Sequence, residues 1–148
     1  MKRSEPVELM NMCVLRRGSK VLVQDRTDPN WPGVAFPGGH VEKGESFTVS
    51  VIPEVQAETG LTISSPRLCG IKDWCEDGVR HVVLLYRAEQ FTGTLRSSDG
   101  ARSGGRSSPV SPRSILHLPT CSTFSACLKK MISASCSTAR TVKIGLTN

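Results

Sequence analysis

The feature that most constrains the fold of this chain is a glycine turn followed by an acidic helical segment, "FPGGHVEKGESFTVSVIPEVQAETGL", at residues 36–61. The glycines at its start let the backbone approach a ligand closely, because glycine has no Cβ and tolerates positive φ. We predict a helix over residues 46–59, ended by Gly60. Its apolar stripe at helical spacing comprises Phe47, Val51 and Val55, with Ile52 beside them.

Strands are predicted on both sides of this helix. Residues 7–15 and 20–25 form a hairpin across "RRGSK", and "VAFPGG" is a short strand that ends in a turn. After the helix, "LCGIKDW" and "RHVVLLYRAEQF" are strands joined by "EDG". Strands before and after one helix predict a mixed α/β or α+β domain rather than a helical bundle.

The composition of the chain changes near Asp99. Residues 1–99 hold 12 of the 19 Lys and Arg residues and all 13 Asp and Glu residues, so their net charge is −1. Residues 100–148 hold 7 basic residues and no acidic ones, which places a charge of +7 on a Ser-, Gly- and Pro-rich segment. We therefore predict a folded domain over residues 1–99 and an atypical basic tail over residues 100–148.

Two interpretations of this tail are open. A basic tail could bind nucleic acid or an anionic surface, but its charges form no dense block and Phe124 is its one aromatic residue. The favoured interpretation is out-of-frame translation beginning near codon 100, which produces an arbitrary composition. We expect one of the other two reading frames after codon 99 to encode an acidic, aromatic-containing helical segment. Sequencing of the coding DNA checks this, and its absence from both frames would contradict the idea.

The location of the protein is predicted from what the chain lacks. No stretch approaches the ~18 consecutive apolar residues of a membrane span, and the N-terminal residues show no secretory pattern. The six cysteines have neither CxxC nor zinc-ligand spacing, which favours reduced, structural thiols. A cytoplasmic protein is therefore expected, and no membrane partner.

Two carboxylates on the predicted helix carry the first indication of chemistry. Glu54 and Glu58 are four residues apart, so both lie on one face and repel each other unless a cation lies between them. Mg²⁺ suits them, because it takes oxygen ligands and is commonly held by one or two carboxylates and substrate phosphates. For the pair alone, an ordinary solvated acidic face is the alternative.

Residues 39–61 resemble the Nudix box, the signature of the Nudix hydrolase family: Gly, five residues, Glu, seven residues, then Arg-Glu-aliphatic-any-Glu-Glu-any-Gly-aliphatic. Gly39 opens the box, Glu45 follows "HVEKG", and "SFTVSVI" is the seven-residue gap. In "PEVQAETGL" the family's positions are held by Glu54, Val55, Glu58, Gly60 and Leu61. The resemblance covers residues 7–99 and implies the Nudix α/β/α sandwich with a mixed sheet.

The resemblance also implies roles for individual residues. Glu54 and Glu58 are the expected catalytic carboxylates and ligands of Mg²⁺ or Mn²⁺, with the main-chain carbonyl of Gly38 as a further ligand. Gly39, Glu45 and Gly60 are the expected structural positions of the box. Arg26, before the loop "TDPNWPG", is a candidate for binding a substrate phosphate, and an exposed arginine at a strand end is the alternative.

Two positions depart from the family's pattern. The family's Arg, which helps to hold the acidic residues in place, is Pro53 here, and the first of the paired glutamates is Ala57. A proline inside a helix removes one N–H donor and clashes with the carbonyl four residues back, at a cost of about 3 kcal/mol. Ala57 favours the helix but removes a carboxylate, so weaker metal binding and slower catalysis are expected.

The resemblance implies a metal-dependent hydrolase that cleaves a diphosphate linkage in a small nucleotide. A nucleoside triphosphate, including an oxidised one, converted to monophosphate and pyrophosphate is the first expectation, as in the MutT-type branch. ADP-ribose or a nucleotide sugar is the second, and a domain that binds a nucleotide without cleaving it is the third. Nucleic acid is not the expected partner, and both a monomer and a homodimer stay open.

Overall fold

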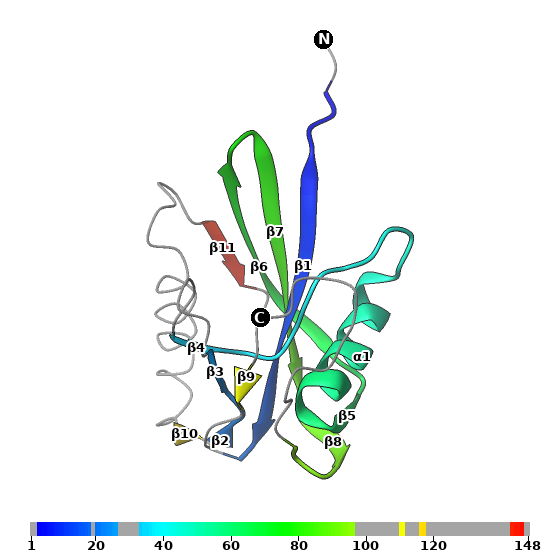
Figure 1. Cartoon of the computed structure of the whole chain (residues 1–148), viewed down its shortest axis with the longest axis vertical. Helices are drawn as coiled ribbons and strands as arrows, with labels where there is room; N and C mark the ends of the chain where they lie inside the picture. The colour runs from blue at the N-terminus through cyan, green and yellow to red at the C-terminus, as the bar shows by residue number, and fades with distance from the viewer. Residues whose placement is uncertain are drawn as a thin grey trace.

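A single helix packed against a mixed sheet forms the described part of the chain (Figure 1). The computed structural model describes residues 3–18, 20–26 and 33–96, and the backbone of three short strands further along. Only the backbone is described at residues 25–26 and 33–34. The elements are β1 (Val7–Arg17), β2 (Lys20–Val21), β3 (Gln24–Arg26), β4 (Gly33–Ala35), α1 (Phe47–Thr59), β5 (Leu61–Ser64), β6 (Arg67–Glu76), β7 (Val79–Ala88), β8 (Gln90–Gly93), β9 (Val110–Ser111), β10 (Leu116–His117) and β11 (Lys143–Leu146).

The main sheet has six strands in the order β10-β2-β1-β7-β6-β11. Its central pair, β1 and β7, is parallel, whereas β2 pairs with β1 and β6 pairs with β7 in the antiparallel sense. Two smaller sheets have the orders β4-β3-β9 and β5-β8. A mixed sheet with a helix on one face confirms the predicted α/β class. The second helical layer implied by the resemblance is not among the described residues.

The turn "EDG" joins β6 to β7 as predicted. Asp77 and Gly78 have φ of 50° and 78°, both in the left-handed region. An Asp-Gly pair is favoured in two-residue hairpin turns that need positive φ at both positions, because this twist matches that of the strands. The hairpin across "RRGSK" is also confirmed, since Arg17 pairs with Lys20.

Two predicted strands are divided in the structure. The prediction of one strand over residues 20–25 was wrong, because β2 belongs to the main sheet and β3 to a separate sheet. The strand predicted over residues 80–91 likewise ends at Ala88, and β8 then pairs with β5 after the helix. In both cases the chain leaves one sheet for another while its composition stays typical of a strand.

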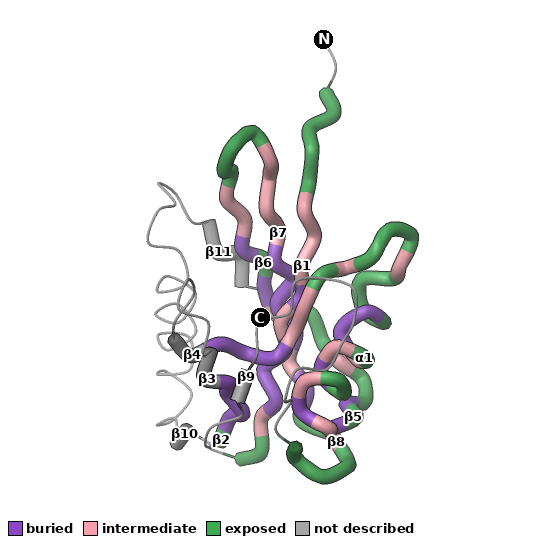
Figure 2. The backbone as a smooth tube through the Cα atoms, viewed as in Figure 1, coloured by how far each residue is buried: buried purple, intermediate pink, exposed green. Residues whose placement is uncertain are grey.

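Buried segments lie in β1, β7 and α1 (Figure 2). The main sheet buries side chains on both faces. Alternate residues of β1 point to opposite faces. Cys13 and Leu15 join the core beneath α1, which also contains Val51 and Val55. Val14 joins a second core on the other face, formed with Val21, Val23, Phe36, Val83 and Leu85.

Helix α1 follows the prediction closely, with one correction. It buries Val51 and Val55, and Ile52 packs against the same cluster. Gly60 ends it with φ of 75°, and its N–H donates to the Gln56 carbonyl at 2.8 Å. The assignment of Phe47 to the apolar stripe was wrong: it is 47% exposed. Phe47 is the first residue of the helix, and at this end the core contact is made by Ser50 and Val51.

Pro53 lies inside α1, and the helix continues through it. Pro53 is exposed, and so is Val49, whose carbonyl would accept the missing N–H. Because that carbonyl belongs to a residue on the solvent side of the helix, water can satisfy it, whereas a buried orphan carbonyl would cost more. The proline therefore weakens the helix without interrupting its packed face.

The described cysteines are free thiols, in agreement with the predicted reduced state. Burial and the nearby Cys69 raise the pKa of the Cys13 thiol to about 12, so it stays protonated and unreactive at neutral pH. Within the described residues, no helix is long and apolar enough to cross a membrane. The predictions for the basic tail lie outside the described residues, apart from the backbones of β9, β10 and β11.

We expect Pro53→Ala to stabilise the fold by about 2 kcal/mol, because it restores an N–H donor inside α1 while loosening the unfolded chain slightly. Chemical denaturation measures the change. Gln56→Ala, at an exposed position of the same helix, is the matched control and should stay within about 0.5 kcal/mol of the unaltered chain. Equal stability of Pro53→Ala and the unaltered chain would mean that the helix already ends at Pro53.

Candidate active site

The glycine loop lies alongside β1 like an additional strand. The Asn11 N–H donates to the Gly39 carbonyl and the Cys13 N–H donates to the Pro37 carbonyl, both at 2.8 Å. A Cβ on Gly38 would lie only 2.7 Å from the Met12 Cα, which is closer than real Cβ contacts allow. Glycine is therefore needed at position 38 because of a close backbone approach rather than a special φ.

The loop fixes the carboxylate of Glu58. The N–H of Gly38 donates to Glu58 Oε2 at 2.9 Å, across 20 residues of sequence. Bonds from N–H groups to an ionised carboxylate are stronger than those between neutral groups. The last turn of α1 is thereby tied to the loop, with the carboxyl group of Glu58 at the junction.

Glu54 lies one turn earlier on α1, against the other glycine. A Cβ built on Gly39 would lie 2.7 Å from Glu54 Cδ, so the absence of a side chain there leaves room for the carboxylate. Glu54 and Glu58 thus contact the same two-residue turn, one at each glycine. The structure brings together three of the residues predicted from the box, and the Gly38 amide joins them.

The environment of Glu54 disfavours its charged form. Burial raises the pKa of the Glu54 carboxyl, Glu45 raises it further, His40 lowers it and Glu42 adds a smaller rise. Neighbouring carboxylates and partial burial both favour the protonated acid. A cation near Glu54 would reverse this preference, because it stabilises the ionised group.

Glu45 stabilises the loop that precedes the helix. Its carboxylate accepts the N–H of Glu42 at 3.1 Å, and its own N–H donates to the Glu42 carbonyl at 3.0 Å. These two bonds close the turn between the glycine loop and α1. The structural role expected for Glu45 stays a prediction. Its charge also raises the pKa of Glu54.

Arg26 is placed only by its backbone. It ends β3, opposite Gly33 of β4. Its side chain lies outside the described residues, so its assignment to a substrate phosphate stays a prediction.

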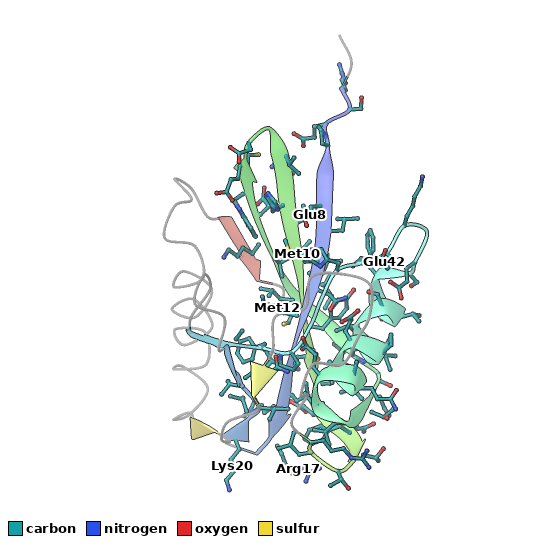
Figure 3. The ribbon with its side chains drawn as sticks, viewed as in Figure 1. Glu8, Met10, Met12, Arg17, Lys20 and Glu42 are labelled. Carbon is teal, nitrogen blue, oxygen red and sulfur yellow. The ribbon has the colours of Figure 1, made fainter. Side chains whose placement is uncertain are left out.

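Sequence reasoning missed a polar cluster beside the loop. The carboxylate of Glu8 contacts His40 Nε2 at 2.8 Å and His81 Nδ1 at 2.9 Å, and Trp74 stacks on the His81 ring with centroids 4.9 Å apart. Figure 3 shows Glu8 on β1 and Glu42 in the loop that leads into α1. The histidines are 41 residues apart in the sequence, so only the pairing of β1 with β7 and with the loop brings them to one carboxylate.

Asn11 was also missed. It is 1% exposed, in the middle of an apolar strand, and its side chain contacts Gly39 and Ser50 of α1. The signal was present in "VELMNMCVL", where one amide interrupts an otherwise apolar run. A buried polar side chain of this kind requires partners.

The donor set for a metal is small. In the part of the chain that the structure describes, no group of three or more His, Cys, Asp and Glu side chains is arranged to hold a metal ion. Glu54 and Glu58 offer two carboxylates beside the glycine turn, where main-chain carbonyls also lie. This suits an ion that takes only one or two protein carboxylates and completes its shell with water and substrate phosphates, as Mg²⁺ does.

We expect Glu54→Gln to stabilise the fold at neutral pH. The pKa of Glu54 is raised in the folded state, so folding opposes the ionisation of this carboxyl. The ordinary pKa of Glu is about 4.3. The free energy of unfolding should therefore fall as the pH rises from that value through the raised pKa. The uncharged amide removes this loss. Both proteins are denatured at a series of pH values from acidic to neutral, without divalent metal. The free energy of unfolding should change less with pH in the variant than in the unaltered chain.

Glu89→Gln, at an exposed position remote from the loop, is the matched control and should retain the slope of the unaltered chain. A Glu54→Gln protein that is less stable at every pH would show that the carboxylate contributes favourable contacts instead.

Solved structures share this fold. The MutT NUDIX hydrolase from Burkholderia pseudomallei superposes with a TM-score of 0.61 and 21% identity, over 79% of this chain and 90% of that one. The MutT protein from Methanosarcina mazei Go1 gives 0.57 and 18%, over 89% and 97% of the two chains. At these identities the likeness concerns the fold alone.

Two proteins of similar sequence match this chain over about half of their own length. The uncharacterized Nudix hydrolase YvcI of Bacillus subtilis is 37% identical over 86 residues, which are 55% of this chain and 53% of YvcI. An ADP-ribose pyrophosphatase of Methanocaldococcus jannaschii is 29% identical over 92 residues, 60% of this chain and 54% of the relative. The chain therefore spans about half the length of these relatives.

The match to a family covers most of the chain. The model of the NUDIX domain matches residues 10–109, a range that includes the glycine loop, α1 and every strand from β3 to β8. With the box residues gathered around the Gly38–Gly39 turn, this chain belongs to the NUDIX domain family.

Proposed function

We propose that this chain is a metal-dependent pyrophosphohydrolase that cleaves a nucleoside triphosphate to monophosphate and pyrophosphate. The observation that carries the proposal is the placement of Glu54 and Glu58 at the two glycines of one turn. Membership of a family whose named relatives are hydrolases supports the enzyme class. The proposed substrate is a small nucleotide. The proposed location is the cytoplasm, where nucleotides are abundant.

Mg²⁺ or Mn²⁺ is the proposed cofactor. Glu54 and Glu58 would hold it together with the Gly38 carbonyl, and the ion would supply polarised phosphate oxygens and a nucleophilic water at neutral pH. Three features support the fit: the oxygen-only donor set, the short spacing of the two carboxylates on one helix face, and the raised pKa of Glu54, which an adjacent cation would lower.

The protein's own groups have separate roles in this proposal. The Gly38 N–H holds Glu58 in place at 2.9 Å. Either Glu54 or Glu58 would help to accept a proton from the attacking water. Glu45 would support the loop, and Arg26 is a candidate for binding a phosphate of the substrate.

The substrate is a nucleoside triphosphate, oxidised or not, rather than ADP-ribose. Two solved structures that share this fold are named MutT, and the MutT-type triphosphate is the first candidate. The relative named ADP-ribose pyrophosphatase makes ADP-ribose, or a nucleotide sugar, the second candidate.

A nucleotide-binding domain without catalysis is the alternative from another class. Pro53 replaces the arginine of the box and Ala57 replaces one of its glutamates. Both positions are exposed, so the core packing does not depend on them. The loss of an arginine and of a glutamate would weaken the chemistry of the site.

A panel of nucleoside triphosphates, oxidised nucleoside triphosphates and ADP-ribose, with and without Mg²⁺, tests the proposal through phosphate or pyrophosphate release. We expect Mg²⁺-dependent release from a triphosphate, and a loss of more than about 100-fold in Glu58→Gln. Removing a residue that only orients a metal ligand lowers metal affinity or activity by about 10- to 100-fold. Removing a ligand itself should lower activity further. Glu76→Gln, an exposed carboxylate at the far end of β6, should retain full activity.

The double variant Pro53→Arg, Ala57→Glu separates the two classes. Higher activity in the double variant, above measurable activity in the unaltered chain, supports an impaired enzyme. No activity in the unaltered chain and strong activity in the double variant would support the non-catalytic domain. Release that proceeds equally without divalent metal would contradict the metal-dependent mechanism.

A further inference from the structure

Asn11 contacts both elements that form the site. Its Nδ2 donates to Ser50 Oγ on α1 at 3.0 Å, and its Oδ1 accepts the N–H of Gly39 at 3.3 Å. Its backbone N–H donates to the Gly39 carbonyl at 2.8 Å. A single buried residue on β1 is thus bonded to the glycine loop on one side and to the helix on the other.

Ser50 extends this connection into the first turn of α1. It is 1% exposed, and its hydroxyl donates to the Phe47 carbonyl at 2.9 Å while accepting the amide of Asn11. Side chains with restricted packing and satisfied hydrogen bonds hold their neighbours in one geometry. Gly39, Asn11 and Ser50 therefore form a continuous bridge from the loop to the helix, which we call the amide bridge.

The amide bridge lies at the opposite end of α1 from the second connection, Gly38 to Glu58. Glu54 is located between the two, against Gly39. Two tethers, one near the start of the helix and one near its end, prevent α1 from pivoting relative to the loop. The distance between the Glu54 carboxylate and the glycine turn depends on both tethers.

The box position that usually carries arginine cannot contribute here, because the Pro53 side chain has no hydrogen-bond donor. The described links between the loop and the helix are the Gly38–Glu58 bond and the bonds that Asn11 makes. Asn11 has both the donor and the acceptor that such a link requires.

We propose that Asn11 is a positioning residue for the reaction, which keeps the glycine loop and α1 at the separation at which Glu54 and Glu58 bind one divalent cation together. The proposal rests on the proposed function. Asn11 does not itself contact the ion or the substrate, and it acts through Gly39 and Ser50.

The test compares Mn²⁺ affinity in the full chain, measured from the electron paramagnetic resonance signal of free Mn²⁺, for Asn11→Ala, Ser50→Ala and the double variant. We expect Asn11→Ala to weaken Mn²⁺ binding by about 10- to 100-fold, as for other residues that orient metal ligands. Ser50→Ala should weaken it in the same direction. Because Asn11 and Ser50 act through one bridge, the Mn²⁺ affinity of the double variant should equal that of Asn11→Ala.

Two further measurements separate positioning from loss of stability. The amide resonance of Gly39 should shift in Asn11→Ala, and Mn²⁺ affinity should fall under conditions in which circular dichroism shows a folded protein. Ile63→Val, a core truncation in β5 that does not touch the loop, is the control and should leave Mn²⁺ affinity unchanged. If Asn11→Ala fails to fold, the Mn²⁺ affinity of Ser50→Ala still tests the positioning role.

Unchanged Mn²⁺ affinity in folded Asn11→Ala or Ser50→Ala would overturn the positioning role and leave the proposed function standing. An unaltered chain that binds no Mn²⁺ would overturn the proposed function, and the positioning role with it. Loss of affinity in Ile63→Val equal to that in Asn11→Ala would show that stability alone governs binding, and would also overturn the proposal.

Discussion

The close approach of the glycine loop to β1 is the constraint on which the site depends. Residues 37–41 bond to β1 in the manner of a strand, and Gly38 lies so near Met12 that no side chain fits between them. This pairing turns the Gly38 N–H toward Glu58 and leaves an open position at Gly39 for Glu54. Any side chain at either glycine would separate the loop from the strand or from the helix.

The acidic groups gathered there reduce stability while they create the site. Burial and the charges of Glu45 and Glu42 oppose the ionisation of Glu54, and His40 compensates only in part. His40 is itself held by Glu8 on β1. The proposed cation would remove the repulsion when it binds, so part of its binding energy would stabilise the fold, as for any ligand that prefers the native state.

The predictions that depended on single turn residues were correct, whereas the strand over residues 20–25 and the place of Phe47 in the apolar stripe were wrong. Gly60 ends α1, and Asp77 with Gly78 forms the turn between β6 and β7. These places in the chain require a positive φ, which glycine, and to a lesser extent aspartate, adopts more readily than other residues. The parallel pairing of β1 with β7 could not be predicted, since nothing in either strand encodes its partner. The division at Glu89 was hidden for the same reason: β7 and β8 share a strand-like composition and belong to different sheets.

The positions of candidate site residues were predictable only where spacing along the chain determined them. Glu54 and Glu58 were identified by their places on one helix face, and the structure puts both at the glycine turn. Asn11 bonds from β1 to the glycine loop and to α1. Glu8 contacts one histidine in the loop and one on β7. The partners of both residues are therefore set by tertiary pairing rather than by distance along the chain. The lone amide in the apolar run of β1 indicated a buried polar contact, but which groups it would meet was decided by the fold.

The two departures from the box lie on the side of α1 that faces solvent. Pro53 and Ala57 are four residues apart and exposed, whereas Val51, Val55 and Thr59 face the core. Folding depends on the buried face, so replacement of the outer residues leaves the core packing intact. The carboxylates Glu54 and Glu58 lie between these faces, half-buried and tied to the loop. A chain of this kind can therefore lose two box residues and retain its fold, because the replaced positions and the packing residues occupy different sides of one helix.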